Sequence, residues 1–217
     1  ITFGTNKRSD VRLKRIIKRG NKSNILLNID SKNINLRIGD LNINNVLASI
    51  AVLKELNIDI LKIKNNFKHY ESSEGRGKKH LILRYNKKFK LIDESYNANP
   101  LSAKFAINKL SSIKKEKFRK FLILGDMLEL GSKSKKYHEE LFKVINKSDI
   151  DKVFIKGKET IFTYKHLNKN KRGNILQNNE DIDLVLNKVI SNNDYLMIKG
   201  SNATGLNYFS ERLIKGK

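Results

Sequence analysis

The chain has 217 residues, of which 39% are apolar and 31% charged, and its formal net charge is +23. This length suits one large domain or two smaller ones, and the apolar fraction is sufficient for a folded core. Cysteine is absent, which excludes disulfides, thiolate metal sites and cysteine nucleophiles. No apolar run approaches the roughly eighteen residues that span a bilayer, and no signal-peptide pattern opens the sequence, so we expect a cytoplasmic protein without membrane insertion.

The high positive charge favours nucleic-acid binding at first sight, because Lys and Arg displace counterions from phosphates. The lysines are spread along the whole chain, however, and the basic clusters (Lys87-Lys88, Lys114-Lys115 and residues 133–136) are short. Neither an aromatic-rich RNA-binding strand nor zinc-finger spacing accompanies them. We therefore interpret the charge as a solvated basic surface and expect no nucleic-acid partner. A basic nucleic-acid-binding α/β module stays open as the alternative from another functional class.

The first part of the chain predicts a hairpin followed by helices. Residues 24–38 alternate apolar and polar residues around a turn-like Asp30-Ser31-Lys32-Asn33, which is typical of a β-hairpin. Residues 43–56 are apolar on most sides and predict a buried helix that ends near Asn57. Asp59 is a suitable N-cap for a short helix that continues to Phe67.

The segment HYESSEGRGKKH, residues 69–80, is polar and contains glycine, so it is the best linker candidate. We place a domain boundary near residues 72–78 and expect domains at 1–75 and 76–217. Because residue 1 is Ile rather than Met, we also expect the sequence to be a fragment or a processed piece.

After this linker, predicted strands alternate with predicted helices. Residues 80–85 and 88–93 form a hairpin around Asn86-Lys87. Further strands are expected at 121–124, 152–155, 174–177 and 195–199, and helices near 101–113, 134–146, 158–166, 181–190 and 204–214. Such alternation predicts βαβ units, and therefore an α/β fold with a Rossmann-like, mainly parallel sheet and right-handed crossovers.

Three polar clusters follow predicted strands: DESYNAN at 93–99, GDMLELG at 125–131 and KGSN at 199–202. In an open parallel sheet, ligands bind at the carboxyl ends of the strands. We therefore expect the three loops to meet at one edge and to form a ligand site. Acidic residues directly after a strand, such as Asp93 and Glu94, commonly accept hydrogen bonds from ribose hydroxyls.

A structural interpretation accounts for part of the first cluster. Asn99 is a good N-cap and Pro100 suits the first helical position, with a buried face formed by Ala103, Ala106, Ile107, Leu110 and Ile113. Capping does not account for Asp93, Glu94, Tyr96 and Asn97. Lys199-Gly200-Ser201 before a helix can hold an anion through its backbone N–H groups and the lysine. We interpret His138 as a hydrogen-bonded structural histidine rather than a catalyst.

Three segments, DESYNANPLS (93–102), LGDMLELG (124–131) and MIKGSN (197–202), resemble signatures of the Mur ligase family, in the branch that adds D-Ala-D-Ala. GDLNINNVLASIAV (39–52) is similar to that family's G-x-H-N-x-x-N-x-x-A-A segment, and GRG (75–77) to its interdomain Gly-Arg. The order and spacing agree along nearly the whole chain. Two positions depart from the pattern: Leu41 stands where the family usually has His, and Asn202 where Arg is common.

The resemblance implies an ATP-dependent amide ligase of peptidoglycan precursor synthesis. ATP, with Mg²⁺, would convert the carboxylate of a UDP-N-acetylmuramoyl-tripeptide to an acyl phosphate, which the amine of D-Ala-D-Ala would attack. Residues 1–75 would be the end of a P-loop-type central ATPase domain, and residues 76–217 the C-terminal domain. A sister Mur ligase or a folylpolyglutamate-synthase-like ligase with another amino-acid substrate stays open.

In this family the phosphate loop, a carbamylated lysine and the Mg²⁺ ligands would precede Ile1, and no G-x-x-x-x-G-K-[ST] occurs in the sequence. We therefore expect no catalytic residue and no metal ligand in these residues, and no ATP turnover by this chain alone. We also expect a monomer. The nucleotide-binding residues carried over by motif are Asn42 and Asn45 (adenine), Arg76 (phosphates or ribose), and Asp93 and Glu94 (ribose). The substrate-binding residues carried over are Tyr96, Asn97, Asn99, Lys199 and Ser201.

Overall fold

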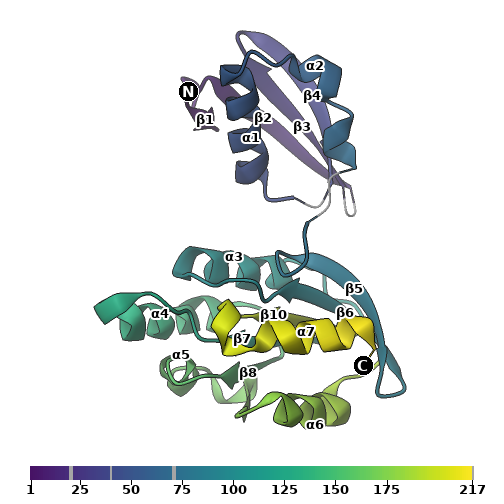
Figure 1. Cartoon of the computed structure of the whole chain (residues 1–217), viewed down its shortest axis with the longest axis vertical. Helices are drawn as coiled ribbons and strands as arrows, with labels where there is room; N and C mark the ends of the chain where they lie inside the picture. The colour runs from purple at the N-terminus through teal and green to yellow at the C-terminus, as the bar shows by residue number, and fades with distance from the viewer. Residues whose placement is uncertain (20–21, 40, 70–71, 217) are drawn as a thin grey trace. The chain divides into compact units, whose positions relative to one another are not determined.

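Figure 1 shows the computed structural model of the chain, which describes residues 1–19, 22–39, 41–69 and 72–216. The chain divides into two compact units, unit 1 at Ile1–Ser72 and unit 2 at Ser73–Lys217. Each unit has its own sheet and its own hydrophobic core. Among the described residues, no helix combines the length and apolarity needed to cross a bilayer.

Unit 1 is a four-stranded sheet in the order β1-β2-β3-β4, with helix α1 packed on it. The elements are β1 (Phe3–Gly4), β2 (Val11–Arg19), β3 (Lys22–Ile29), β4 (Lys32–Ile38), α1 (Ile43–Glu55), α2 (Ile60–Ile63) and the 3₁₀ turn η1 (Asn66–Lys68). Strands β2, β3 and β4 pair antiparallel, and β1 pairs parallel with β2.

The predicted hairpin is confirmed as β3 and β4, joined at Asp30 and Ser31, whose φ angles of 49° and 61° suit a tight hairpin turn. The predicted buried helix is also confirmed as α1. The helix expected from Asp59 to Phe67 is shorter: Asp59 caps α2, which ends at Ile63, before η1 begins.

Strand β2 was not predicted, and a bulge is the reason. The register of β2 against β3 shifts between Leu13 and Arg15, so the alternation of apolar and polar residues that identifies a strand is broken there. Val11 and Leu13 face the core before the shift, whereas Ile16 and Ile17 are both exposed after it.

Unit 2 is a six-stranded sheet in the order β5-β6-β10-β7-β8-β9. Its strands are β5 (Lys78–Arg84), β6 (Lys87–Glu94), β7 (Lys120–Gly125), β8 (Lys152–Lys156), β9 (Arg172–Ile175) and β10 (Tyr195–Lys199). Strand β5 runs antiparallel to β6, and the other neighbours pair parallel, so the prediction of a mainly parallel sheet is confirmed.

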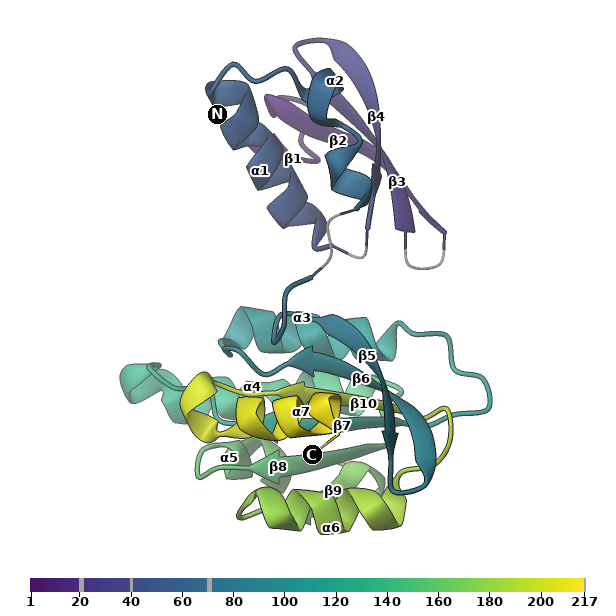
Figure 2. The same ribbon diagram turned by 45° about the vertical axis from the view of Figure 1, so that its right-hand side comes forward.

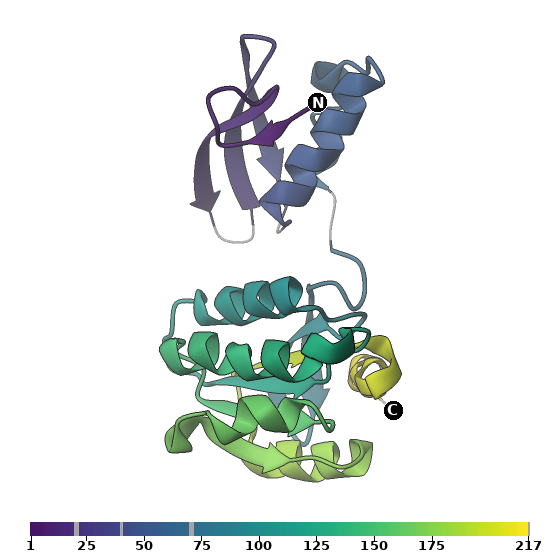
Figure 3. The same cartoon turned by 90° about the vertical axis from the view of Figure 1, so that its left-hand side faces the viewer.

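Helices cover both faces of this sheet (Figures 2 and 3). They are α3 (Pro100–Ser111), α4 (Ser134–Lys147), α5 (Thr160–Lys165), α6 (Asn179–Val189) and α7 (Leu206–Lys215), with 3₁₀ turns η2 (Gly131–Lys133), η3 (Lys169–Lys171) and η4 (Asn202–Thr204). One apolar cluster joins α3, α4 and α5 to one face, and a second joins α6 and α7 to the other. The predicted apolar face of α3 is buried, and Ile113 beyond it is partly buried.

Candidate functional site

The order of the strands in unit 2 brings three polar loops together. Strand β10 lies between β6 and β7, and its last residue, Lys199, is opposite Glu94 on one side and Leu124 on the other. The loops that follow these three strands are therefore neighbours at the carboxyl edge of the sheet (Figure 1). The predicted meeting of the three loops at one edge is confirmed.

The loops after β7 and β10 touch through glycine. A Cβ atom on Gly125 would lie 3.3 Å from Gly200 Cα and 2.6 Å from Leu206 Cδ1, so any side chain there would push the loops apart. Ser201 then joins the loops by hydrogen bonds. Its backbone N–H donates to Asp126 O at 2.9 Å, and its Oγ accepts from Leu128 N at 2.9 Å.

Asp126, from the same polar cluster, has a structural role. Its carboxylate accepts backbone N–H groups of Lys158, Glu159 and Thr160 at 2.8–3.3 Å. These N–H groups belong to the start of α5, where they have no partner within the helix. Asp126 therefore caps α5 and fixes the position of the β7 loop.

His138 in α4 is fully buried and holds the same loop. Its Nε2 accepts from Met127 N at 2.9 Å, and its Nδ1 lies 2.9 Å from Ser134 O, a carbonyl that can only accept. This pattern assigns the neutral imidazole with the proton on Nδ1. The structural interpretation of His138 is thus confirmed.

In the loop after β6, Asp93 is 3% exposed and ties that loop to the chain before β5. One carboxylate oxygen accepts from Gly75 N at 2.9 Å, and the other accepts from Ser95 N at 3.2 Å and Ser95 Oγ at 2.6 Å. Gly75 has a φ of 68°, and a Cβ atom there would lie 2.6 Å from Tyr96 Cβ. Glycine at position 75 is required for this close approach.

Arg76 follows Gly75 and lies at the surface of the site. Its guanidinium stacks over the Tyr96 ring, with Cζ 4.2 Å from the ring centroid. Both side chains are exposed. A guanidinium held on an aromatic ring keeps its N–H donors directed outward, where they can bind a phosphate or carboxylate.

The partly buried Glu94 forms an ion pair with the buried Lys199 beside Arg76, with Lys199 Nζ 3.7 Å from Glu94 Oε2. Lys199 Nζ also donates to Asn97 O at 2.6 Å. Burial raises the pKa of Glu94, and Lys199 and Lys109 partly oppose that shift. Burial likewise lowers the pKa of Lys199, opposed by the charge of Glu94. Opposite charges with such shifts, at the carboxyl edge of a parallel sheet, are typical of a functional site.

Two other predicted substrate residues have local hydrogen bonds. Asn99 accepts from Ser102 N at 2.8 Å, and Ser102 Oγ accepts from Asn99 N at 3.0 Å, which completes a capping box at the start of α3. Asn97 is exposed, and its side-chain oxygen accepts from Ala98 N at 2.7 Å.

The last two predicted substrate residues, Lys199 and Ser201, are only 2% and 4% exposed. A substrate contact through either side chain would therefore compete with the hydrogen bonds that it already makes.

The predicted adenine contacts lie in unit 1, whereas the residues above lie in unit 2. Asn42 is the N-cap of α1, where its side chain accepts from Asn44 N at 2.9 Å. Asn45 is exposed in the first turn of α1. The described structure therefore brings the unit 2 residues together and leaves Asn42 and Asn45 on a separate unit.

Glu74, His80 and Asp93 have potential metal-binding atoms within 4.8 Å of one another. The carboxylates of Glu74 and Asp93 are already engaged inside the protein. Glu74 contacts Lys78 Nζ at 2.7 Å and His80 Nε2 at 2.9 Å, and Asp93 accepts the three hydrogen bonds given above. We assign no metal to this cluster.

Comparison with known proteins identifies the relatives of this chain. Residues 81–202 match the family model described as "Mur ligase, glutamate ligase domain". A UDP-N-acetylmuramoyl-tripeptide–D-alanyl-D-alanine ligase of Buchnera aphidicola (subspecies Baizongia pistaciae) is 31% identical over 82% of this chain and 37% of its own length. The enzyme of the same name from Bacillus subtilis is 33% identical over 58% of this chain and 28% of its own length.

Solved structures agree on the fold. The MurF ligase from Thermotoga maritima, solved in complex with ADP, has a TM-score of 0.79 at 22% identity, over 98% of this chain and 48% of that one. A MurF structure from Acinetobacter baumannii also has a TM-score of 0.79, at 20% identity, over 98% of this chain and 46% of that one.

The chain spans well under half of the length of these two curated relatives, 37% and 28% respectively. The family model, by contrast, covers more than half of this chain and includes the strands and loops that form the carboxyl edge of unit 2. The chain belongs to the Mur ligase family.

Proposed function

We propose that this chain is part of an ATP-dependent amide ligase that joins D-Ala-D-Ala to a UDP-N-acetylmuramoyl-tripeptide in peptidoglycan precursor synthesis. The observation that carries the proposal is the carboxyl edge of unit 2, where the exposed Arg76–Tyr96 stack lies beside the partly buried Glu94 and its buried partner Lys199. The names of the relatives supply the substrates. The enzyme would act in the cytoplasm, as a monomer.

In this proposal unit 1 is the end of the central ATPase domain and unit 2 is the C-terminal domain. Asn42 and Asn45 would then contact the adenine, and Arg76, Asp93 and Glu94 the phosphates and ribose. The exposed Arg76 suits a nucleotide phosphate directly, because its donors are not buried. Asp93 would act mainly by holding the loop that presents Glu94 and Tyr96, since its carboxylate is already engaged.

ATP, when bound with Mg²⁺, supplies the phosphoryl group that converts the substrate carboxylate to an acyl phosphate. The residues of this chain would orient the other reactant. Tyr96 and Asn97 are exposed beside Arg76 and would line the position of the dipeptide. Lys199 would fix the backbone of that loop through Asn97 O, and Ser201 would fix the neighbouring loops. Asn99 would contribute through the cap that starts α3.

Steady-state kinetics of the full-length enzyme would test these assignments. Glu94→Ala should raise the KM for ATP by roughly tenfold or more, because a charge-assisted hydrogen bond contributes about 1.5–3 kcal/mol. Asn97→Ala should instead raise the KM for D-Ala-D-Ala and leave that for ATP unchanged. Lys143→Ala, an exposed residue of α4, is the matched control and should change neither constant.

The substrate assignment has its own test. ADP release with UDP-N-acetylmuramoyl-tripeptide should depend on D-Ala-D-Ala and should not be supported by single amino acids. Activity with a single amino acid and none with the dipeptide would identify a sister ligase instead. Wild-type kinetics in both variants would remove Glu94 and Asn97 from the site.

A further inference from the structure

Lys109, in the last turn of α3, reaches the carboxyl edge of unit 2 beside Gly77. Gly77 directly precedes β5 and has a φ of 95°, and its backbone N–H donates to Asp93 O at 2.6 Å. A Cβ atom at this position would lie 2.7 Å from Glu94 Oε1 and 2.9 Å from Lys109 Nζ. The carboxylate and the ammonium group therefore approach the same point, and only glycine leaves room for both.

Each carboxylate oxygen of Glu94 thus faces a different cation. Oε2 lies 3.7 Å from Lys199 Nζ, whereas Oε1 lies on the side of Gly77 and Lys109. The two lysines come from different elements, Lys199 from β10 and Lys109 from α3. Positive charge on both sides of the carboxylate favours one orientation of the Glu94 side chain.

Lys109 differs from Lys199 in having no other partner. Lys199 Nζ donates to Asn97 O at 2.6 Å and to Glu94 O at 3.3 Å, so its removal would also release the β6 loop. Among the residues that the structure describes, Lys109 Nζ has no hydrogen bond and no carboxylate oxygen within 4 Å, so it acts on Glu94 through space. Replacing Lys109 therefore removes a charge and leaves the contacts of the loop in place.

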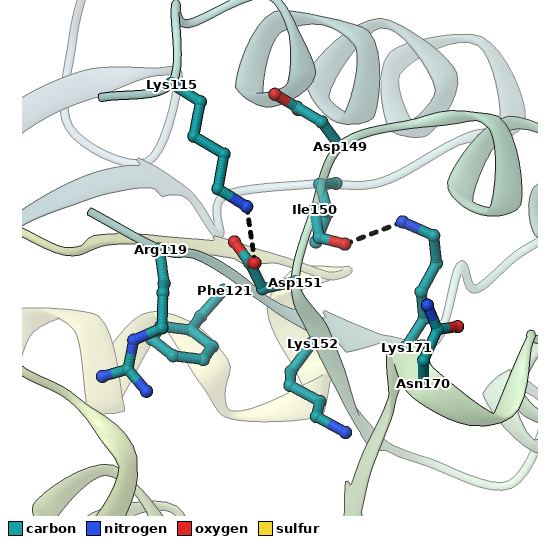
Figure 4. Close-up of a pocket in the computed structure, with 9 residues that line it drawn as sticks. All are labelled: Lys115, Arg119, Phe121, Asp149, Ile150, Asp151, Lys152, Asn170 and Lys171. Atoms are coloured by element: carbon teal, nitrogen blue, oxygen red, sulfur yellow. Dashed lines mark hydrogen bonds and ion pairs between the residues drawn. The ribbon is translucent and has the colours of Figure 1, made fainter. Parts of the chain in front are cut away.

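The lysines of a charged cavity elsewhere in unit 2 are engaged, by contrast. This cavity, of about 470 Å³, lies at the opposite edge of the sheet, where β7 and β8 begin (Figure 4). Lys115 Nζ lies 2.6 Å from Asp151, and Lys171 Nζ donates to Ile150 O at 2.8 Å. Groups of the protein hold these lysines, so we assign no ligand to the cavity, whereas Lys109 faces a carboxylate at the candidate site.

The charge of Glu94 depends on the groups around it. Burial raises the pKa of Glu94, Lys199 and Lys109 oppose that shift, and Asp93 adds to it. Burial lowers the pKa of Lys199, Glu94 opposes that shift, and Arg76 adds to it. The charged groups that face the pair are therefore Asp93 on β6, Lys199 on β10, Lys109 on α3 and Arg76 before β5. An ionised carboxylate accepts stronger hydrogen bonds than a protonated one, so cations that keep Glu94 ionised also strengthen its binding of a hydroxyl.

We propose that Lys109 is a further positioning residue of the nucleotide site. Together with Lys199 it keeps the Glu94 carboxylate ionised and oriented, so that Glu94 accepts a hydrogen bond from a nucleotide hydroxyl. Lys109 acts through Glu94 and does not itself touch the ligand. The inference rests on the proposed function, which gives Glu94 its ligand.

The charge of Glu94 can be measured without any nucleotide. In a chain labelled with ¹³Cδ-glutamate, the Glu94 signal is identified by its loss in Glu94→Gln, and its pH titration gives the pKa. We expect a higher pKa of Glu94 in Lys109→Met and a return toward the wild-type value in Lys109→Arg. Lys143→Met, at an exposed residue of α4, is the matched control and should leave that pKa unchanged. An unchanged Glu94 pKa in Lys109→Met would overturn the inference.

Steady-state kinetics of the full-length enzyme measure the consequence for binding. Lys109→Met should raise the KM for ATP about two- to fivefold, as expected for the loss of a partly exposed charge pair, and Lys109→Arg should restore it. The increase should grow as pH falls, because more of Glu94 becomes protonated, while kcat and the KM for D-Ala-D-Ala stay unchanged. A cation in the last turn of α3 also stabilises the helix dipole, but the loss of that role alone would lower stability without this pH dependence.

Glu94→Ala separates this inference from the proposed function. A raised KM for ATP in Glu94→Ala with a wild-type KM in Lys109→Met overturns the role of Lys109 and leaves the nucleotide role of Glu94 intact. A wild-type KM in both variants overturns the nucleotide role of Glu94 and the inference with it. An equal increase in Lys143→Met would also overturn the role of Lys109, because the effect would then reflect the general basic charge.

Discussion

The side chain of Lys199 is buried, and its pKa depends on that burial and on the neighbouring carboxylate of Glu94. Its pKa is lowered from the usual 10.5, and that of Glu94 is raised from the usual 4.5. Because folding favours the protonated form of Glu94, its contribution to the free energy of unfolding is fully present below its unfolded pKa. That contribution is lost as pH rises through its higher folded pKa. Because folding favours the neutral form of Lys199, its contribution to the free energy of unfolding is present above its unfolded pKa. That contribution is lost as pH falls through its lower folded pKa. Burial of the two groups therefore reduces stability over the pH range in which both are charged, a cost that proteins tolerate at functional sites.

The coupling between these two groups gives a first prediction. Glu94→Gln removes the negative charge that opposes the burial shift, so the pKa of Lys199 should fall further. An NMR titration of the Lys199 side chain, assigned by loss of its signal in Lys199→Arg, would measure both values. An unchanged or higher pKa in Glu94→Gln would show that the 3.7 Å pair does not control the charge of Lys199.

Asp126 gives a second prediction, about stability. Asp126→Ala leaves three backbone N–H groups at the start of α5 without their acceptor, so the free energy of unfolding should fall by about 1–3 kcal/mol. Glu116→Ala, at an exposed acidic residue, is the matched control and should change it by less than about 0.5 kcal/mol. Chemical denaturation of both variants measures the difference. Equal losses would mean that the α5 cap contributes nothing.

Helix α3 connects the candidate site to the core of unit 2. Its first turn is fixed by Asn99 and Ser102, directly after the loop that carries Tyr96 and Asn97. Its inner face lies in the apolar cluster with strands β6, β7 and β10. The packing of one helix therefore determines where the β6 loop ends, and the site residues depend on that packing without belonging to the core.

The two faces of α3 provide a third prediction. Leu110 is fully buried, whereas Leu101 is 80% exposed. Leu110→Ala should reduce the free energy of unfolding by about 2–5 kcal/mol through lost burial and a cavity, and Leu101→Ala should change it by less than about 0.5 kcal/mol. Urea denaturation monitored by circular dichroism would compare the two variants. A similar cost for both would contradict the burial of this face.

The division of the chain into two units has consequences for its chemistry and its folding. Each unit buries its own apolar residues, so each meets the basic requirement for folding alone. The nucleotide contacts carried over from the family are divided between the units, with Asn42 and Asn45 in unit 1 and Arg76 and Glu94 in unit 2.

Limited proteolysis provides a fourth prediction, about this division. Cleavage should occur first within residues 70–80 and leave a stable C-terminal fragment of about 140 residues, since proteases prefer segments between folded units. Mass spectrometry of the products identifies the cut. Early cleavage mainly within residues 90–200 would contradict the independent stability of unit 2.

Local patterns in the sequence were sufficient to predict most helices and strands and the edge where the polar loops meet. Strand–helix alternation and hairpin turns depend on neighbouring residues, and the carboxyl edge follows from the rule for parallel sheets. Strand β2 was not predicted because its bulge interrupts the alternation of apolar and polar residues that identifies a strand. Strand β9 lies at Arg172–Ile175 rather than at the predicted 174–177 because its place is fixed by pairing with β8, not by local apolar residues.

The roles of the polar side chains depend on contacts between distant segments, which no local pattern contains. Asp126 and the α5 backbone it caps are more than thirty residues apart, and Lys199 and the Asn97 carbonyl are 102 residues apart. The strand order that places β10 between β6 and β7 creates the Glu94–Lys199 pair and removes much of it from water. Since a pKa shift and a hydrogen-bond partner both follow from which groups are desolvated together, only the folded arrangement separates structural carboxylates such as Asp126 from candidate ligand contacts such as Glu94.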